Sequence, residues 1–302
     1  MRRKWYGRDT ELSVRMFLTM FLLAALYLGF LVVLWRSGVG FVTLALIAGV
    51  MLGVQYFFSD KLVLLSMGAK VLKPNERPEL QAMVERLAAL ADLPRPRVAI
   101  VDHSMPNAFA TGRNPQNAVV AVTTGILNKL DRAELEAVLA HELTHIKNRD
   151  AMVLTLASFL SSIAFFVLRS SIVLGYGYGG GYGRRRGREG QAAVFVYLAA
   201  LAVWVISFFL IRALSRYREF AADRGGAIIT GAPSQLSSAL LKISGAMQRI
   251  PQRDLREVET MNAFFIVPAL SRSSILELFS THPSVEKRIA RLQRMEQQME
   301  ER

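Results

Sequence analysis

The residues best suited to chemistry are two histidines four positions apart. His141 and His145 enclose Glu142 in the sequence HELTH, on a helix predicted to begin at Asp131 as N-cap with Glu134 three residues later. Residues four apart lie on one face of a helix, so both imidazoles can reach one metal ion. Glu142 can then contact a water molecule at that ion without binding the ion, which is the position of a general base. The alternative is a surface helix with two solvated histidines.

A hydrolytic zinc site needs a third protein ligand and an open fourth position. The chain has no cysteine, so carboxylates or another histidine are the candidates. Glu219 and Asp223 stand four residues apart in the sequence RYREFAAD and therefore project from one helical face. Glu219 can bind the ion, and Asp223 can accept a proton from a ligand imidazole and fix its tautomer. Taken alone, this segment would be an ordinary amphipathic helix.

Long apolar segments separate the polar parts that carry these residues. Four runs of 18 to 20 residues contain no charged side chain: 16–35, 39–58, 151–168 and 192–211. A helix needs about 20 apolar residues to cross a bilayer, so each run can span or nearly span it. Buried helical hairpins of a soluble core are the alternative, but such helices normally keep a polar face. The runs therefore predict two transmembrane hairpins.

The overall composition excludes several classes of protein. Hydrophobic residues make up 52% of the 302 positions, which is far too many for a disordered chain. The absence of cysteine excludes a disulfide-stabilised secreted module, a thiolate metal site and a thiol nucleophile. The formal net charge of +13 is explained by attraction to an anionic lipid bilayer, and no nucleic-acid partner is expected. The stretch of Gly, Tyr and Arg at 175–190 is typical of a flexible linker.

The distribution of basic residues predicts the orientation of the chain in the membrane, but one loop conflicts with it. The N-terminal tail has five Lys and Arg residues, whereas only Arg36 lies between the first two runs. The positive-inside rule then places the N-terminus and both polar blocks in the cytoplasm if all four runs cross. Five arginines between 169 and 188 would lie outside in that arrangement. Either that loop is translocated, or the third and fourth runs do not fully cross, and the sequence leaves both possibilities open.

The motifs together resemble a known family. HELTH and RYREFAAD, with PNAFATG from Pro106, MNAFFIVP from Met261 and FSTHP around His282, are similar to the HtpX-type membrane zinc metalloproteases, gluzincins related to the CAAX prenyl endopeptidases. The resemblance covers essentially the whole chain. It implies that one zinc ion per chain (Zn2+) is held by three ligands and that a neighbouring glutamate activates water. The implied zinc ligands are His141, His145 and Glu219, with Glu142 as catalytic residue and Asp223 as the orienting carboxylate.

The same resemblance assigns roles to two further segments. PNAFATG resembles an edge strand that pairs with an extended substrate, which would make Asn107, Ala108, Phe109 and Ala110 substrate-binding residues. A Gly/Asn turn between strands 98–101 and 118–122 explains the segment equally well. His282 resembles a catalytic histidine that stabilises the oxyanion, and the alternative is a solvated histidine before a proline.

We therefore expect a mainly α, polytopic membrane protein with a gluzincin-like metalloprotease domain and a small edge β-sheet. Four segments are expected. Residues 1–58 form an N-terminal tail and hairpin, and residues 59–150 form the first half of the protease domain with HELTH. Residues 151–211 form a second hairpin, and residues 212–302 form the second half of the protease domain with the third ligand.

The expected function is that of a zinc endopeptidase of the cytoplasmic (inner) membrane, with its active site in the cytoplasm. Polypeptide substrates, in particular damaged or misfolded membrane proteins, would link it to protein quality control and the stress response. An intramembrane protease is disfavoured because charged residues flank HELTH. A non-proteolytic zinc-binding scaffold or transporter is the other alternative, although the four apolar runs lack the ionisable groups that transport requires.

Overall fold

A computed structural model describes residues 9–36, 41–177, 188–247, 249, 266 and 280–301. The described helices are α1 (Thr10–Arg36), α2 (Phe41–Ser66), α3 (Pro78–Leu90), α4 (Thr124–Lys129), α5 (Arg132–Lys147), α6 (Asp150–Gly177), α7 (Arg188–Thr230), α8 (Pro233–Met247) and α11 (Val285–Glu300). The strands are β1 (Lys70–Val71), β2 (Arg97–Val101), β3 (Ala108–Thr111) and β4 (Val119–Thr123), with a single 3-10 turn, η1 (Pro115–Asn117). The centre of the Gly/Tyr/Arg-rich stretch lies outside the described residues, as does MNAFFIVP apart from Ile266.

The predicted mainly α membrane fold with a small sheet is confirmed. Within the described residues, three helical segments are long and apolar enough to cross a membrane: Thr10–Arg36, Asp150–Arg169 and Val194–Thr230. The second apolar run forms α2. Large apolar side chains point outward on these helices, with Phe17 72% and Phe195 60% exposed. Such exposure suits a lipid environment, because hydrocarbon rather than water then surrounds these side chains.

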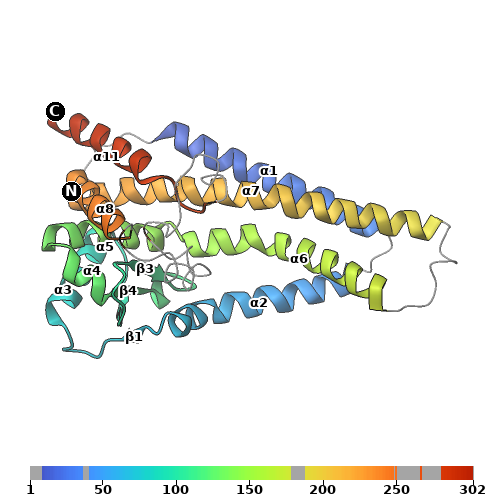
Figure 1. Ribbon diagram of the computed structural model, residues 1–302, viewed down its shortest axis with the longest axis horizontal. Coiled ribbons are helices and arrows are strands. Elements are labelled where there is room, and N and C mark those ends of the chain that lie inside the picture. Colours follow the sequence, from blue (N-terminus) through green and yellow to red (C-terminus); the bar gives the residue numbers. More distant parts are fainter. Residues whose placement is uncertain are drawn as a thin grey trace.

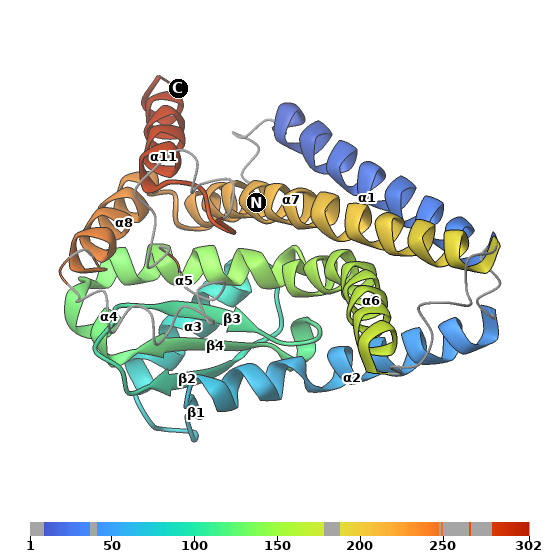
Figure 2. The same ribbon diagram turned by 45° about the vertical axis from the view of Figure 1, so that its right-hand side comes forward.

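The long helices are held together by apolar packing and a few hydrogen bonds. α1 packs along α7, α7 packs along α6, and α2 contacts α6 (Figures 1 and 2). The Tyr27 hydroxyl of α1 donates to the carbonyl oxygen of Ala157 in α6 at 2.5 Å. The Ser207 hydroxyl of α7 donates to that of Ser161 in α6 at 2.8 Å. Hydrogen bonds of this kind join helices where the hydrophobic effect between them is weak. The packing along α7 makes that helix the main partner of α1, and the two hydrogen bonds join α1 and α7 to α6.

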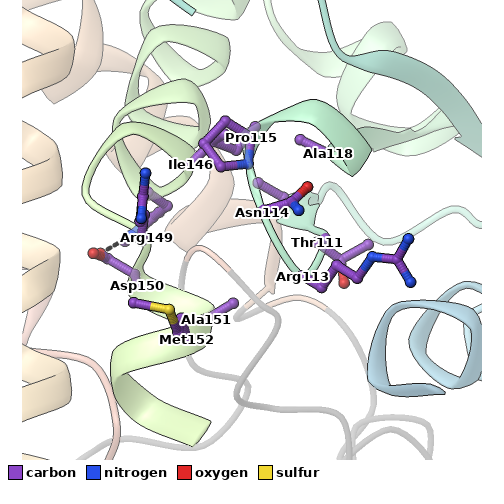
Figure 3. Close-up of a pocket in the computed structure, with 13 residues that line it drawn as sticks. Thr111, Arg113, Asn114, Pro115, Ala118, Ile146, Arg149, Asp150, Ala151 and Met152 are labelled. Atoms are coloured by element: carbon purple, nitrogen blue, oxygen red, sulfur yellow. Dashed lines mark hydrogen bonds and ion pairs between the residues drawn. The ribbon is translucent and has the colours of Figure 1, made fainter. Parts of the chain in front are cut away.

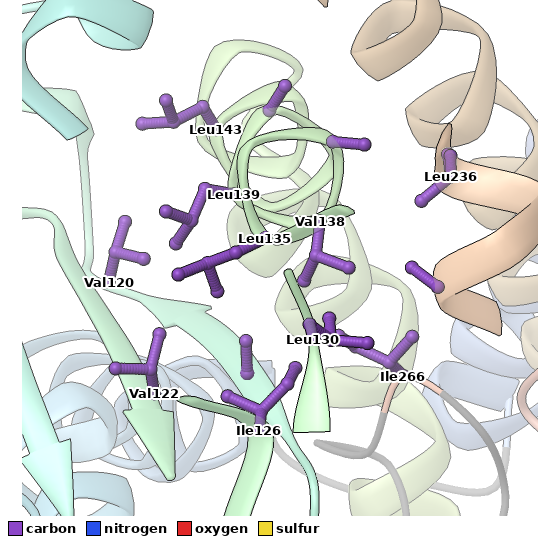
Figure 4. Packing of buried hydrophobic residues seen from close by; sticks show 14 of the residues in the cluster. Val120, Val122, Ile126, Leu130, Leu135, Val138, Leu139, Leu143, Leu236 and Ile266 are labelled. Atoms are coloured by element: carbon purple, nitrogen blue, oxygen red, sulfur yellow. The ribbon is translucent and has the colours of Figure 1, made fainter. Parts of the chain in front are cut away.

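The polar domain is gathered at one end of the long helices and is built on a four-stranded sheet (Figure 1). The strand order is β1-β2-β4-β3, with β2 and β4 parallel and the other pairs antiparallel, so β3 is an edge strand. One sheet face packs Val120 and Val122 against Leu135 and Leu139 of α5 (Figure 4). The other face, which includes Phe109, packs against the end of α2. The PNAFATG segment therefore forms an edge strand and not only a turn.

Helix α5 begins as predicted. The Asp131 carboxylate accepts a hydrogen bond from the amide of Glu134 at 3.0 Å, and the Glu134 carboxylate accepts one from the amide of Asp131 at 3.0 Å. This reciprocal capping box fixes the start of the helix. Glu134 also binds Ser238 at 2.7 Å and Lys242 at 2.5 Å, both on α8. The N-terminus of the HELTH helix is thus fixed to α8.

Two glycines bring α7 close to α5. A Cβ atom at Gly225 would lie 2.3 Å from Cγ2 of Thr144, and one at Gly226 would lie 2.9 Å from the amide nitrogen of His141. No larger residue fits at these distances, so the glycines permit the close approach. α7 runs without interruption from the apolar run through Glu219 to Thr230. The membrane helix itself therefore carries the second group of polar residues to the HELTH helix.

Candidate active site

Three predicted ligands converge on one point. The Nε2 atoms of His141 and His145 lie 3.1 Å apart, and the Glu219 carboxylate oxygens lie 3.7 Å from the former and 3.5 Å from the latter. One ligand atom from each residue falls within 4.8 Å of the others. Ligands at bond lengths of about 2.0–2.1 Å in a tetrahedral zinc site are separated by about 3.3 Å. The spacing therefore fits three ligands of one metal ion.

The chemistry of these atoms also fits a divalent cation. Oε2 of Glu219 is buried and has no hydrogen bond of good geometry among the described residues, although Nδ1 of His282 lies 3.3 Å and Nη1 of Arg288 lies 3.4 Å from it. A buried carboxylate oxygen without such a partner is costly unless a cation binds it. Two imidazole nitrogens and one carboxylate oxygen, without thiolate, are a ligand set typical of catalytic zinc. The residues present thus fit a zinc ion.

His141 is held by a carboxylate and an arginine. Its Nδ1 atom lies 3.0 Å from Oδ1 of Asp223. Asp223 in turn accepts two hydrogen bonds from Arg288 of α11, at 2.9 Å from Nε and 2.6 Å from Nη2. Arg288 is fully buried, and its Nη1 donates to the carbonyl oxygen of Ile266 at 2.7 Å. A carboxylate in this position can fix the tautomer of His141 and leave Nε2 free to bind a metal ion.

His145 has an equivalent arrangement that sequence reasoning missed. Its Nδ1 atom lies 2.6 Å from Oδ2 of Asp150, the first residue of α6. The other oxygen of Asp150 is ion-paired with Arg218 of α7, which also donates to the carbonyl oxygen of Asn148 at 2.8 Å. Asp150 and Arg218 are both buried. Each histidine thus contacts a carboxylate that is paired with a buried arginine.

These partners were hard to find in the sequence for different reasons. Asp150 follows His145 by five residues, and in the sequence it is only one of several charged residues that flank HELTH. Arg218 is the residue before Glu219, so it lay inside a motif that had already been singled out. Arg288 lies in an ordinary charged helix 65 residues after its partner Asp223, and only the packing of α11 reveals it.

Glu142 faces the same place from the HELTH helix. Its side chain is buried, and burial raises the pKa of the carboxyl to about 7, against a smaller lowering by the nearby His145 and by a hydrogen bond from the backbone of Ala110. A carboxyl with a pKa near neutrality can take up a proton and release it again at physiological pH. This environment suits a general base.

An open cavity of about 630 Å³ connects these groups. Glu142 and the three candidate ligands line it, together with Ala108, Phe109 and Ala110 of the edge strand and Ser215 and Ile266. Asn107 does not line the cavity, because its side-chain oxygen accepts a hydrogen bond from the amide of Ile266 at 3.1 Å. The structure therefore places three of the four predicted substrate-binding residues along the cavity wall.

His282 also lines the cavity. Its Nδ1 atom lies 3.3 Å from Oε2 of Glu219, and only 6% of the residue is exposed. The alternative of a solvated histidine is therefore wrong. The imidazole stands close enough to the candidate ligands to face a substrate bound there.

Comparisons with known proteins show which family the chain resembles. Residues 74–296 match the model of a family described as peptidase family M48. A "Protease HtpX homolog" of Moorella thermoacetica is 64% identical over 300 residues, which cover 99% of each chain. A "Protease HtpX homolog 1" of Streptomyces coelicolor is 47% identical over 98% of this chain and 96% of its own. The crystal structure of Ste24p of S. mikatae has a similar fold, with a TM-score of 0.56 at 18% identity, covering 94% of this chain and 67% of that one.

Proposed function

Because the chain belongs to peptidase family M48 and is a membrane metalloprotease, we propose that it is a zinc endopeptidase whose active site is the cavity at HELTH. One observation carries the proposal: His141, His145 and Glu219 converge beside Glu142 in a cavity walled by an edge strand. That combination offers a metal site, a general base and a surface for an extended peptide. The family gives no support to the alternative of a non-proteolytic scaffold or transporter.

The proposed mechanism assigns a task to each residue. A zinc ion, when bound by His141, His145 and Glu219, supplies polarisation of the scissile carbonyl and lowers the pKa of water. Glu142 takes the proton of the attacking water and passes it to the leaving amine. His282 donates a hydrogen bond to the developing oxyanion. The edge of β3 pairs with the substrate backbone, as added strands do.

A cleavage assay tests the endopeptidase activity. The detergent-purified chain is incubated with an unfolded polypeptide, and the products are analysed by mass spectrometry. Internal cleavage with new termini away from the chain ends is expected, because the cavity is open along β3. Release of single terminal residues would instead indicate an exopeptidase.

Membrane proteins are the proposed substrates, and quality control under stress is the proposed role. The cavity is lined by Asp150, Ala151 and Leu154 at the start of α6 and by Ser215 of α7, so it lies where two membrane helices enter the polar domain. A polypeptide loop or tail near the bilayer surface would reach it without leaving the membrane.

The cytoplasmic location of the active site predicts a labelling pattern. Because the chain has no cysteine, single cysteines can be introduced at Ser66 and at Gly180, which lies outside the described residues. We expect a membrane-impermeant thiol reagent to label Gly180→Cys but not Ser66→Cys from outside intact cells, since four spans place Ser66 inside. Protection of both would mean that the second hairpin does not cross. Labelling of Ser66→Cys would contradict a cytoplasmic active site.

The contact between Asp150 and His145 predicts that a change at Asp150 weakens metal binding. Asp150→Asn keeps the shape of the side chain but weakens its hold on His145, so we expect zinc affinity to fall by about 10- to 100-fold. Competition with a chromophoric chelator measures the dissociation constant. Asp92→Asn, a change at an exposed aspartate outside the cavity, is the control and should leave it unchanged. Equal affinities in all three proteins would show that Asp150 does not orient the ligand.

A further inference from the structure

A second pocket adjoins the catalytic cavity. It has an open volume of about 360 Å³ and lies between the end of β3 with the following turn and the junction of α5 and α6 (Figure 3). Ala110, His145, Asp150 and Ala151 line both hollows, so the pocket lies directly beside the cavity. A substrate held along β3 would therefore pass from one into the other.

Two arginines lie at this pocket. Arg149 lies on the side of α5 and α6, and Arg113 lies on the side of β3 with Thr111 and Asn114 (Figure 3). The guanidinium of Arg113 points away from Arg149 and lies 5.6 Å from the ring centre of Phe57 in α2, so Arg149 is the main source of positive charge. Arg149 is exposed, and its side chain has no ion pair or hydrogen bond within the described part of the chain. The pocket has one carboxylate, Asp150, which is buried and already paired with His145 and Arg218. The charge of Arg149 is therefore not neutralised by the lining of the pocket.

The backbone at Arg149 adds an independent observation. Its φ angle is 55°, in the left-handed region that glycine and asparagine adopt most easily. The backbone conformation at this helix junction therefore does not favour an arginine over glycine or asparagine. Asn75, Arg77 and Asp92, which lie outside the pocket, also have positive φ angles, so it is the position and the charge of Arg149 that point to a ligand.

We propose that this pocket binds an acidic side chain of the substrate and so contributes to the choice of cleavage site. The inference rests on the proposed protease function. A strand advances about 3.3 Å per residue. Ala108 and Ala110 line the catalytic cavity, whereas Thr111 and Arg113 line only the pocket. An aspartate or glutamate about two to four residues from the cleaved bond would thus lie near Arg149, with Arg113 on the far wall.

An anionic lipid headgroup is the competing occupant, because α6 begins at this pocket. The position of the pocket directly beside the cavity favours the substrate. A side chain of a peptide in the cavity enters the pocket directly, whereas a headgroup there would block the path along β3.

The test uses matched peptides and the full chain, first in a detergent without anionic lipid and then in anionic vesicles. Each peptide has glutamate or glutamine at one position, scanned over four residues on both sides of a single cleavable bond. We expect the wild type to cleave the glutamate peptide about fivefold more efficiently, in kcat/KM, at one or two positions on one side only, which is the scale of one exposed ion pair. Arg149→Gln should abolish this preference, so that the variant has equal kcat/KM values for the glutamate and the glutamine peptides.

Two further variants test whether the charge of Arg149 causes the preference. Arg149→Glu should prefer lysine at the same position. Arg77→Gln changes another exposed arginine of positive φ, 49°, outside the pocket, and should keep the wild-type preference. Cleavage of the glutamine peptides without any preference for glutamate would overturn the subsite but leave the protease intact. An Arg149→Gln effect that is equal for all peptides and requires anionic vesicles would also overturn it, in favour of a lipid.

Discussion

Replacement of Glu142 by glutamine is expected to lower the rate of peptide-bond cleavage by at least about 100-fold, the usual scale for the loss of a general base. Glutamine keeps the size of the side chain and its ability to accept a hydrogen bond from the backbone of Ala110. It cannot take up a proton at neutral pH. The metal content of the variant should equal that of the wild type, because Glu142 is not among the residues that converge as ligands.

A matched control for this change lies on the same helix. Glu136 is paired with Arg86 at 2.7 Å and is not part of the cavity lining. Glu136→Gln should therefore retain the full rate. If Glu142→Gln cleaved at the wild-type rate while Glu136→Gln did the same, the role of Glu142 as base would be wrong.

Alanine in place of His141, His145 or Glu219 is expected to remove the bound zinc and, with it, the proteolytic activity. Each change leaves two protein ligands, which is fewer than the three of a catalytic zinc site. The metal-to-protein ratio of each purified variant measures the effect, and a near-unity ratio is expected for the wild type. The fall should exceed that of Asp150→Asn, which weakens the hold on a ligand without removing one.

Glu219→Ala is the most informative of the three. Glu219 lies far from HELTH in the sequence, so its role as a ligand is the least obvious of the three. Undiminished zinc in this variant would mean that another residue completes the site, and His282 would be the first candidate, since its Nδ1 atom lies 3.3 Å from the Glu219 carboxylate.

Sequence reasoning predicted the features that depend on local spacing. The start of the HELTH helix follows from its predicted N-cap, and the capping box of Asp131 and Glu134 is present in the structure. The membrane helices follow from the lengths of the charge-free runs. The positions of Glu219 and Asp223 on one helical face follow from their spacing of four. These inferences need only one element at a time.

Features that depend on the packing of distant elements were not predictable. Nothing in the composition of α11 distinguishes Arg288 from the other arginines of that helix, yet it alone is fully buried against Asp223. The need for glycine at Gly225 and Gly226 becomes clear only from the atoms of α5 that they approach. The preference of α1 for α7 likewise emerges from packing between segments far apart in the chain.

We propose that one zinc ion at His141, His145 and Glu219 drives the proteolysis. A titration of zinc into the metal-free, detergent-purified chain tests this directly, with the cleavage rate of a model peptide recorded at each addition. We expect a rate near zero without metal that rises in proportion to added zinc and levels off at about one ion per chain, the number that one such site can hold. Full cleavage by the metal-free chain would contradict it.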